Sequence, residues 1–209
     1  ASHPEICMSS VKETAFFVAE RNWSKGLTWY RSHFRGQARV YGESSPAYTM
    51  HPRFSGVPER IHQVIPDVKL IYLVRDPIER IRSDYAHRVS LGTEREPLDK
   101  ALFGPDARPW YIDNSRYDYQ IRQYLQVFSR ERILIVDHRD LATSRRATLR
   151  RVFEFLDVDP SIESPSFERE WNATRDKRGM NVIGRRLKPE HVGRLQRSLE
   201  RLPWALRWR

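Results

Sequence analysis

Two short runs of apolar residues predict the strands of a buried parallel sheet. The first covers residues 69–74, Lys-Leu-Ile-Tyr-Leu-Val, and the second covers residues 132–137, Arg-Ile-Leu-Ile-Val-Asp. Both runs are continuous rather than alternating, which is typical of parallel strands covered on both faces. A shorter strand candidate spans residues 39–43. Because helical patterns follow the two long runs, we expect an α/β fold, with helices flanking a parallel sheet and ligands beyond the carboxyl ends of its strands.

The residues after the first run predict the start of a helix. Asp76 is a residue type that caps helix N-termini, Pro77 suits the first helical position, and Glu79 stands three residues after the cap. Gly92 is a natural end for this helix. Its apolar residues recur on one face: Ile78, Ile81, Tyr85 and Val89.

Several other stretches show the apolar spacing of helices. The predicted helices cover residues 27–35, 58–64, 117–128, 148–156 and 189–202, with residue 142 as an alternative start for the fourth. Residues 93–109 are polar and are punctuated by Pro97, Gly104 and Pro105, so we expect a mobile loop over a site or a partner surface. A length of 209 residues suits a single domain, which we expect over residues 1–209.

The first strand and its helix together predict an anion-binding site. Free N–H groups at a helix N-terminus and the positive end of the helix dipole favour a phosphate. Arg75, at the end of the strand, adds a guanidinium with paired donors. Ser83 lies on the helix face that carries Asp76 and Arg80, so its hydroxyl is expected to face the same pocket. The alternative is an ordinary capped helix with a surface arginine.

Charge and cysteine content narrow the classes of partner. The formal net charge is +10, with 37 basic and 27 acidic residues and only six lysines among the basic ones. An arginine excess suits bidentate recognition of phosphate, sulfate or carboxylate, and it equally follows from a GC-rich genome. The chain shows no zinc-finger spacing, no aromatic RNA-binding signature and no basic leucine zipper, so we expect no nucleic-acid partner.

Cys7 is the single cysteine, which excludes a disulfide framework and fits a reducing compartment. The seven histidines show no ligand spacing and no paired acidic motif points to magnesium, so no metal is expected. No apolar run approaches the roughly 18 residues that span a bilayer, and we expect a cytoplasmic protein with no membrane span.

Four motifs taken together resemble a known enzyme family. They are residues 11–17 (VKETAFF), 42–48 (GESSPAY), 75–83 (RDPIERIRS) and 153–158 (FEFLDV). In this order they resemble sulfotransferases that use 3'-phosphoadenosine-5'-phosphosulfate (PAPS), closest to the heparan-sulfate and bacterial carbohydrate type. The resemblance runs from about residue 3 to about residue 185. It implies a parallel sheet of the phosphate-loop NTPase type and a nucleotide-binding transferase, with a carbohydrate or another hydroxyl-bearing molecule as acceptor.

The resemblance also implies residues that hold the donor nucleotide. The strand-end arginine and the helix serine of the family bind the 3'-phosphate, and here they are Arg75 and Ser83. Tyr117, together with Ser115, matches a further motif of the family. A late basic loop with a glycine closes over the nucleotide, and residues Lys177, Arg178 and Gly179 stand at its place.

The catalytic residues implied by the resemblance are Glu13 and Lys12. In the family the glutamate lies beside the acceptor as general base, and the lysine is an electrostatic helper. Sulfuryl transfer proceeds in line from the donor phosphate to an acceptor oxygen or nitrogen, so it requires positioning, charge stabilisation and one proton removal. The alternative is a solvated Lys-Glu pair beside a core anchor formed by Phe16 and Phe17.

The sequence also departs from the family pattern. The family begins with a strand and a loop of glycine and threonine that cradles the 5'-phosphosulfate and supplies a lysine, and nothing here matches that loop. We therefore expect the chain as given to lack a first strand, loop and helix, and to be inactive or nearly so. Ala15 replaces a polar residue often seen at its position.

Two further groups of residues have alternative roles. Trp23, Trp29 and Tyr30 are expected in the core, whereas Trp110 and Tyr111 are candidates for stacking on a sugar. Glu43 and Ser45 either shape the acceptor site or cap their own loop.

Three other functions compete with sulfuryl transfer: a non-catalytic nucleotide- or anion-binding module of the same type, a nucleotide kinase, and a nucleic-acid-binding protein. A kinase requires a lysine and a serine or threonine beside magnesium, a pattern that this sequence does not contain. Nucleic-acid binding would show a steep loss of affinity with salt.

Overall fold

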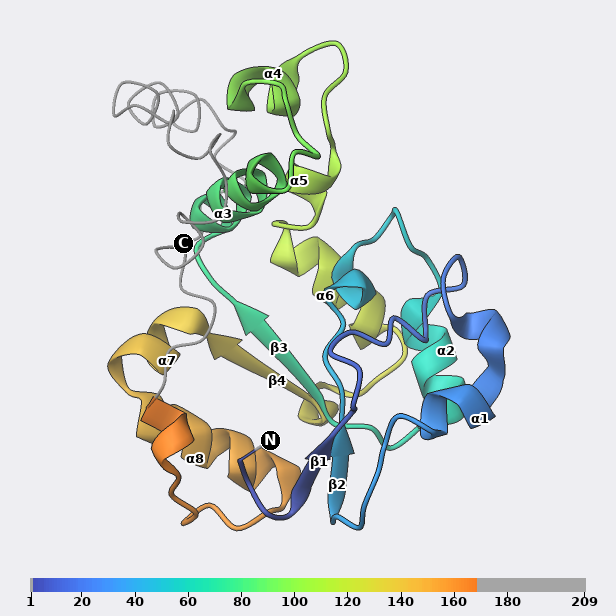
Figure 1. Cartoon of the computed structure of the whole chain (residues 1–209), viewed down its shortest axis with the longest axis vertical. Coiled ribbons are helices and arrows are strands. Elements are labelled where there is room, and N and C mark those ends of the chain that lie inside the picture. Colours follow the sequence, from blue (N-terminus) through green and yellow to red (C-terminus); the bar gives the residue numbers. More distant parts are fainter. Residues whose placement is uncertain (1, 169–209) are drawn as a thin grey trace. The chain divides into compact units, whose positions relative to one another are not determined.

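The computed structural model describes residues 2–168, which form two compact units (Figure 1). Unit 1 consists of residues 2–74 and 118–168, and unit 2 of residues 75–117. The predicted helix at 189–202 lies outside the described residues. The expectation of one domain over the whole chain stays a prediction.

Unit 1 contains two pairs of parallel strands. β1 (Ile6–Met8) pairs with β2 (Val40–Gly42), and β3 (Leu70–Val74) pairs with β4 (Ile133–Asp137). Parallel strands need a crossover, and helices of unit 1 lie between the paired strands in the sequence. The predicted α/β class and the positions of the three predicted strands are confirmed.

The expectation that both long strands are covered on both faces is wrong. Ile71 and Leu73 on β3 are 44% and 50% exposed, and Ile135 on β4 is 49% exposed. Helices α7 (His138–Thr143) and α8 (Arg145–Leu156) pack on β4, where Val136 is buried. The described helices therefore leave apolar side chains of these strands uncovered.

Aromatic side chains dominate the core of unit 1. Phe16, Phe17 and Tyr30 are buried, with the rings of Phe16 and Tyr30 stacked at 4.5 Å between centroids. Trp23 and Trp29 pack against this core, as predicted. The helices that surround it are α1 (Gly26–Arg31), α2 (Val57–Val64) and α6 (Tyr117–Leu125). Short 3₁₀ helices cover Trp23–Lys25, Pro46–Thr49, Arg130–Arg132 and Pro165–Glu168.

Unit 2 is helical and has its own core. It contains α3 (Pro77–Ser90), α4 (Leu98–Phe103) and α5 (Trp110–Asp113). The buried side chains of this core come from all three helices: Ile81, Tyr85, Leu98, Ala101, Leu102 and Tyr111. The predicted start and end of α3 are confirmed, since the helix begins at Pro77 and Gly92 follows it with φ of 70°.

Residues 93–109 do not form a loop throughout, which corrects the expectation for this segment. The segment contains α4, whose buried residues 98, 101 and 102 repeat at helical spacing and fill the core of unit 2. Pro97 precedes the helix, where a proline is tolerated, and Gly104 ends it. Within residues 2–168, no helix combines the length and the apolar character needed to cross a bilayer.

Candidate active site

The N-terminus of α3 is capped by its own aspartate. The Asp76 carboxylate accepts hydrogen bonds from the backbone N–H groups of Ile78 at 2.9 Å and Glu79 at 3.0 Å. This cap confirms the sequence prediction but changes its consequence. Because the cap already uses two of the free amides, an anion near this helix has to be bound mainly by side chains.

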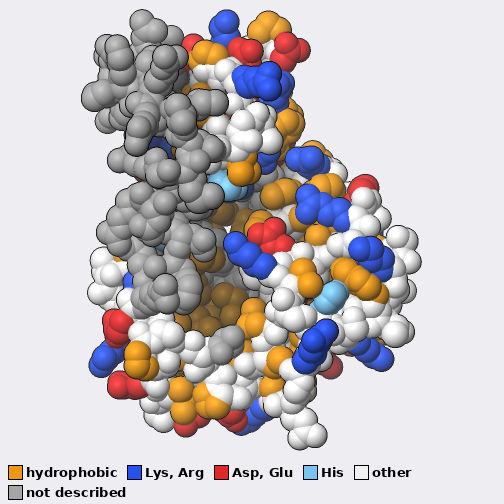
Figure 2. All heavy atoms as spheres, in the orientation of Figure 1, with side chains coloured by type: hydrophobic (Ala, Val, Ile, Leu, Met, Phe, Trp, Pro, Cys, Tyr) orange, Lys and Arg blue, Asp and Glu red, His pale blue; other side chains and the backbone are white. Residues whose placement is uncertain are grey.

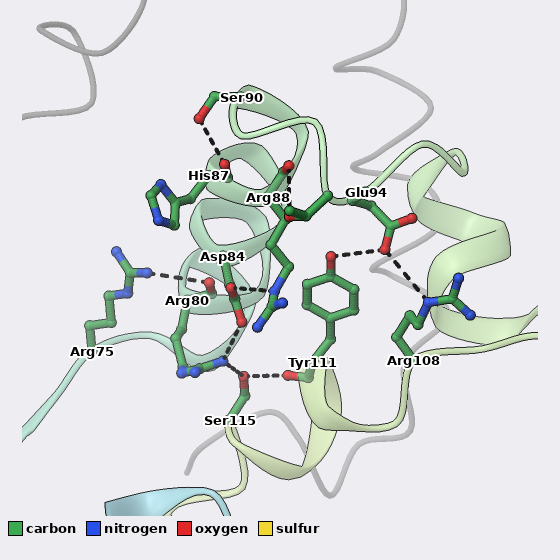
Figure 3. Close-up of polar contacts among 11 residues, drawn as sticks. Arg75, Arg80, Asp84, His87, Arg88, Ser90, Glu94, Arg108, Tyr111 and Ser115 are labelled. Carbon is green, nitrogen blue, oxygen red and sulfur yellow. Dashed lines mark hydrogen bonds and ion pairs between the residues drawn. The ribbon is translucent and has the colours of Figure 1, made fainter. Parts of the chain in front are cut away.

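Arg75 is the side chain best placed for that role. Its guanidinium lies along α3 and donates to the carbonyl oxygen of Arg80 at 3.3 Å (Figure 3). Among the described residues, no carboxylate lies within ion-pair distance of Arg75. Burial lowers the pKa of Arg75, and the nearby Arg80 guanidinium lowers it further, although the field of Tyr117 opposes this. An incoming anion would compensate this half-buried charge.

Tyr117 and Arg80 fix the surroundings of Arg75. The backbone N–H of Arg75 donates to the Tyr117 hydroxyl at 3.4 Å, and Tyr117 is buried. The Arg80 guanidinium donates to Ser115 Oγ at 3.2 Å and lies 3.6 Å from the Asp84 carboxylate (Figure 3). Asp84 therefore forms an ion pair with Arg80, whereas Arg75 feels the charges of Asp84 and Glu79 without a direct ion pair to a described carboxylate.

Ser83 lies one helical position before Asp84 and is half-buried. The carbonyl that accepts from Arg75 belongs to residue 80 and points toward residue 84 along the helix, so the guanidinium lies beside the turn that carries Ser83. Within residues 2–168 the Ser83 hydroxyl has no hydrogen-bond partner. Unit 2 therefore joins Arg75 to Tyr117 by a hydrogen bond and carries Ser83 on α3, one turn after the Arg80 carbonyl that Arg75 contacts.

Tyr111 is not a sugar platform, contrary to the sequence interpretation. Its side chain is 0% exposed, and its hydroxyl donates to the buried Glu94 carboxylate at 3.1 Å (Figure 3). The neighbouring Trp110 ring lies 5.5 Å from the Arg88 guanidinium and 5.9 Å from that of Arg108. These contacts make the pair part of the internal packing of unit 2.

Lys12 and Glu13 lie in unit 1, in the segment that follows β1. Both side chains are exposed, and the next five residues, 14–18, are buried. This arrangement confirms that Phe16 and Phe17 anchor the segment in the core. An exposed carboxylate beside a fixed turn has the access to an acceptor hydroxyl that a general base needs.

Glu43 follows the parallel neighbour strand β2 and gathers four hydroxyl groups. Ser45 and Tyr48, from its own loop, donate to it at 2.8 Å and 2.5 Å. Thr14 donates at 2.6 Å and Tyr30 at 3.3 Å. The interpretation of a loop capped by its own side chains is therefore confirmed, and the cap extends to the segment that carries Glu13.

The predicted nucleotide loop of Lys177, Arg178 and Gly179 lies outside the described residues. Residues 2–168 contain no cluster of three or more His, Cys, Asp or Glu side chains arranged to hold a metal ion. On the face drawn in Figure 2, the described Lys and Arg side chains lie in several separate groups, interspersed with Asp and Glu.

Comparison with known proteins identifies the family. A model of the sulfotransferase family matches residues 1–161. Heparan sulfate glucosamine 3-O-sulfotransferase 5 of Mus musculus is 31% identical over 185 residues, which cover 83% of this chain and 51% of that protein. Bifunctional heparan sulfate N-deacetylase/N-sulfotransferase 1 of Caenorhabditis elegans is 25% identical over 158 residues, which cover 71% of this chain and 18% of that protein.

A solved structure shows the same fold. A sulfotransferase from Alicyclobacillus acidocaldarius matches with a TM-score of 0.69 and 23% identity, over 99% of this chain and 90% of that one. The chain spans about half the length of the 3-O-sulfotransferase that it matches. The family match covers well over half of the 209 residues. The chain therefore belongs to the sulfotransferase family.

Proposed function

We propose that the protein moves a sulfuryl group from PAPS to a hydroxyl or amine of a carbohydrate or small-molecule acceptor. The observation that carries this proposal is the match of the sulfotransferase family model to residues 1–161. The relatives named for heparan sulfate glucosamine support a carbohydrate acceptor. The geometry within each unit supports specific residues for the two halves of the reaction.

Arg75, Ser83 and Tyr117 are the proposed contacts of the donor's 3'-phosphate. Arg75 offers a half-buried guanidinium without a carboxylate partner among the described residues, and Ser83 offers a hydroxyl on the adjacent turn. Tyr117 holds the Arg75 backbone. A guanidinium and a hydroxyl together match the acceptor oxygens of a phosphate. Lys177, Arg178 and Gly179 are proposed to complete the nucleotide site.

Glu13 is the proposed general base and Lys12 the proposed electrostatic helper. In the reaction, the acceptor oxygen forms a bond to sulfur while the bond between sulfur and the donor's phosphate oxygen breaks. Glu13 takes the acceptor proton, and adenosine 3',5'-bisphosphate leaves. The protein's contribution is then positioning, one proton transfer and stabilisation of the charge that develops on the leaving oxygen.

The test is transfer of labelled sulfate from PAPS to a panel of oligosaccharides by the full-length protein. A positioned base contributes about 100- to 10,000-fold, so Glu13→Gln should lower kcat by that order. The matched control is Glu20→Gln, which removes the same charge from an exposed position of the same segment and should leave kcat unchanged. Binding of adenosine 3',5'-bisphosphate without transfer to any acceptor would favour the non-catalytic module instead.

The remaining expectations are part of the proposal. The single cysteine supports a cytoplasmic location, and the resemblance to carbohydrate sulfotransferases of bacteria supports a bacterial enzyme. Metal independence rests on the lack of ligand spacing among the histidines, and unchanged transfer in the presence of a chelator would test it.

A further inference from the structure

The turn that follows Glu13 is strained. Ala15 has φ of 44°, in the left-handed region that residues with a Cβ rarely adopt. Such a backbone costs about 1–3 kcal/mol and persists only where the surroundings hold it. Part of the hold comes from Asn22, whose Nδ2 donates to the Thr14 carbonyl at 2.7 Å. Val18 N–H also donates to the Ala15 carbonyl, at 3.3 Å.

Three consecutive backbone amides of this turn are bound by hydroxyl oxygens. Ala15 N–H donates to Ser45 Oγ at 2.9 Å, and Phe16 N–H donates to Thr14 Oγ1 at 3.3 Å. Phe17 N–H donates to the Tyr48 hydroxyl at 3.5 Å. Successive amides around a left-handed residue form a concave group of donors that ordinarily attracts an anion.

The anion that these amides face is the protein's own Glu43, reached through the hydroxyls. The hydroxyls of Thr14, Ser45 and Tyr48 each lie within donating distance of the Glu43 carboxylate, at 2.6, 2.8 and 2.5 Å. The Thr14 and Tyr48 oxygens also lie 3.2 Å apart, and the carboxylate, as the charged acceptor, is the stronger partner for both protons. Each oxygen is then left with lone pairs only, which accept from the backbone amides. The carboxylate thus sets the direction of three hydroxyls at once.

The hydroxyls keep these roles over a wide pH range. Burial raises the pKa of Tyr48, and the neighbouring Glu43 charge raises it further. Burial and Glu43 raise the pKa of Tyr30 in the same way. Thr14 is 0% exposed, so no water competes for its contacts. The two tyrosines that donate to Glu43 are therefore neutral donors at physiological pH.

We propose that Glu43 is a positioning residue for the reaction, which holds the turn at residues 14–17 through three hydroxyls and thereby fixes the direction of Glu13. The inference rests on the proposed role of Glu13 as the base. Glu43 does not contact the reacting atoms itself. Its effect on the rate comes entirely through the backbone that leads out of Glu13.

Glu43→Gln tests the inference because it keeps the shape and removes acceptor capacity. The side-chain nitrogen of glutamine cannot accept a hydrogen bond, so at least one hydroxyl has to turn away and loses its alignment with a backbone amide. A misplacement of about 1 Å costs up to about 100-fold, and we expect kcat to fall about 10- to 100-fold. The KM for the donor should stay within about twofold, since the donor contacts are unchanged.

The pH profile separates positioning from base loss. In Glu43→Gln the acidic limb of the kcat profile should remain, because the proposed base is still present, whereas in Glu13→Gln it should disappear. Ser45→Ala, which removes one link and leaves the carboxylate, should lower kcat in the same way. The double variant of Glu43 and Ser45 should then lose less than the product of the two single losses. Glu20→Gln is again the charge-matched control.

Hydrogen exchange gives a measurement independent of activity. In the full-length Glu43→Gln protein, the amides of residues 15–17 should exchange faster while amides in the core of unit 2 are unchanged. A wild-type kcat, or unchanged exchange at residues 15–17, would overturn the inference, as would a loss of activity that only follows the loss of folded protein. If the wild-type protein transfers no sulfuryl group, the proposed function and the catalytic part of this inference both fail, whereas exchange still decides whether Glu43 holds the turn.

Discussion

Replacing Arg75 with alanine should weaken binding of one phosphate group and leave the rest of the nucleotide unaffected. Arg75 is the half-buried cation at the end of β3, and among the described residues it has no carboxylate partner. Its donors are therefore available to an external anion. The perturbation removes these donors without exposing a buried carboxylate, so the fold should persist.

The magnitude follows from the kind of contact. A hydrogen bond to a charged group contributes about 1.5–3 kcal/mol, and a guanidinium can make two to one phosphate. Allowing for water that replaces the side chain, we expect a loss of about 2–4 kcal/mol, or about 30- to 1,000-fold in Kd. Arg75→Lys keeps the charge but loses the paired geometry, so it should fall between wild type and alanine. Ser83→Ala removes one neutral donor and should cost about 1 kcal/mol, or about fivefold.

The assay is calorimetric titration of the full-length protein with two nucleotides at one fixed ionic strength. Adenosine 3',5'-bisphosphate carries the 3'-phosphate, and adenosine 5'-monophosphate does not. The ratio of their Kd values isolates the 3'-phosphate. The control is Arg122→Ala on α6, which removes the same charge from a side chain that is 73% exposed and pairs with the exposed Asp118. It accounts for any general effect of the +10 net charge.

The expected result is that Arg75→Ala narrows the ratio of the two Kd values by about 30- to 1,000-fold, whereas Arg122→Ala leaves it unchanged. Equal weakening of both nucleotides would show that Arg75 acts elsewhere on the ligand or on the fold. An unchanged ratio would refute the assignment of the 3'-phosphate to Arg75. Either result would refute the role given to Arg75, whereas membership of the sulfotransferase family would still stand.

Three further predictions concern stability. Leu102→Ala should lower the free energy of unfolding by about 2–5 kcal/mol in urea titration, because the side chain is buried in the core of unit 2, whereas Phe103→Ala, at a half-exposed position, should cost under about 1 kcal/mol. Glu94→Gln should cost about 2–3 kcal/mol in the same assay, since the buried carboxylate accepts from the Tyr111 hydroxyl and from two backbone amides, and a loss below about 0.5 kcal/mol would contradict this. Burial raises the pKa of Tyr124, so above about pH 10 the folded state retains a proton that the unfolded state loses. The contribution of this group to the free energy of unfolding should therefore be constant below that pH and should fall above it by about 1.4 kcal/mol per pH unit. Tyr124→Phe should reduce that alkaline slope by one proton, which urea titrations between pH 9 and 11 would measure.

Sequence patterns were sufficient where structure is set within a few residues. The cap by Asp76, the proline at the first helical position and the glycine after the helix all act over one or two turns, and the structure contains all three. The β3 and β4 strands were also identified from their own composition. In each case the partner that satisfies the backbone is close in the sequence.

The sequence predictions were wrong where contacts with distant segments determine the local structure. The same apolar run forms a strand whether one face or two are covered, so the exposure of Leu73 could not be predicted. In residues 93–109, the prolines and the glycine suggested a loop and hid the helical spacing of Leu98 and Leu102. Those leucines favour a helix because they pack in one core with side chains of α3, which is a separate segment of the sequence.

The hydroxyl cluster at Glu43 was missed for a similar reason. Thr14 and Glu43 are 29 residues apart, and they meet because β1 and β2 are parallel and both chains leave the strands at the same edge. Recognition of residues 6–8 as a strand would have predicted this meeting. No local sequence pattern predicted the hydrogen bond from the Tyr30 hydroxyl, which lies on α1, to Glu43.

Internal carboxylates decide which donor groups remain for a ligand. The free amides at the start of α3 are used by Asp76, and the three amides of the turn at residues 15–17 are directed, through hydroxyls, to Glu43. Both features resemble anion sites in their backbone geometry, yet each already has its anion. Arg75 differs, because no described carboxylate forms an ion pair with it, although the more distant charges of Glu79 and Asp84 raise its pKa. A donor nucleotide would therefore be bound here by the Arg75 side chain rather than by backbone amides. Replacing Arg75 should lower the affinity for the nucleotide and leave the surrounding backbone unchanged.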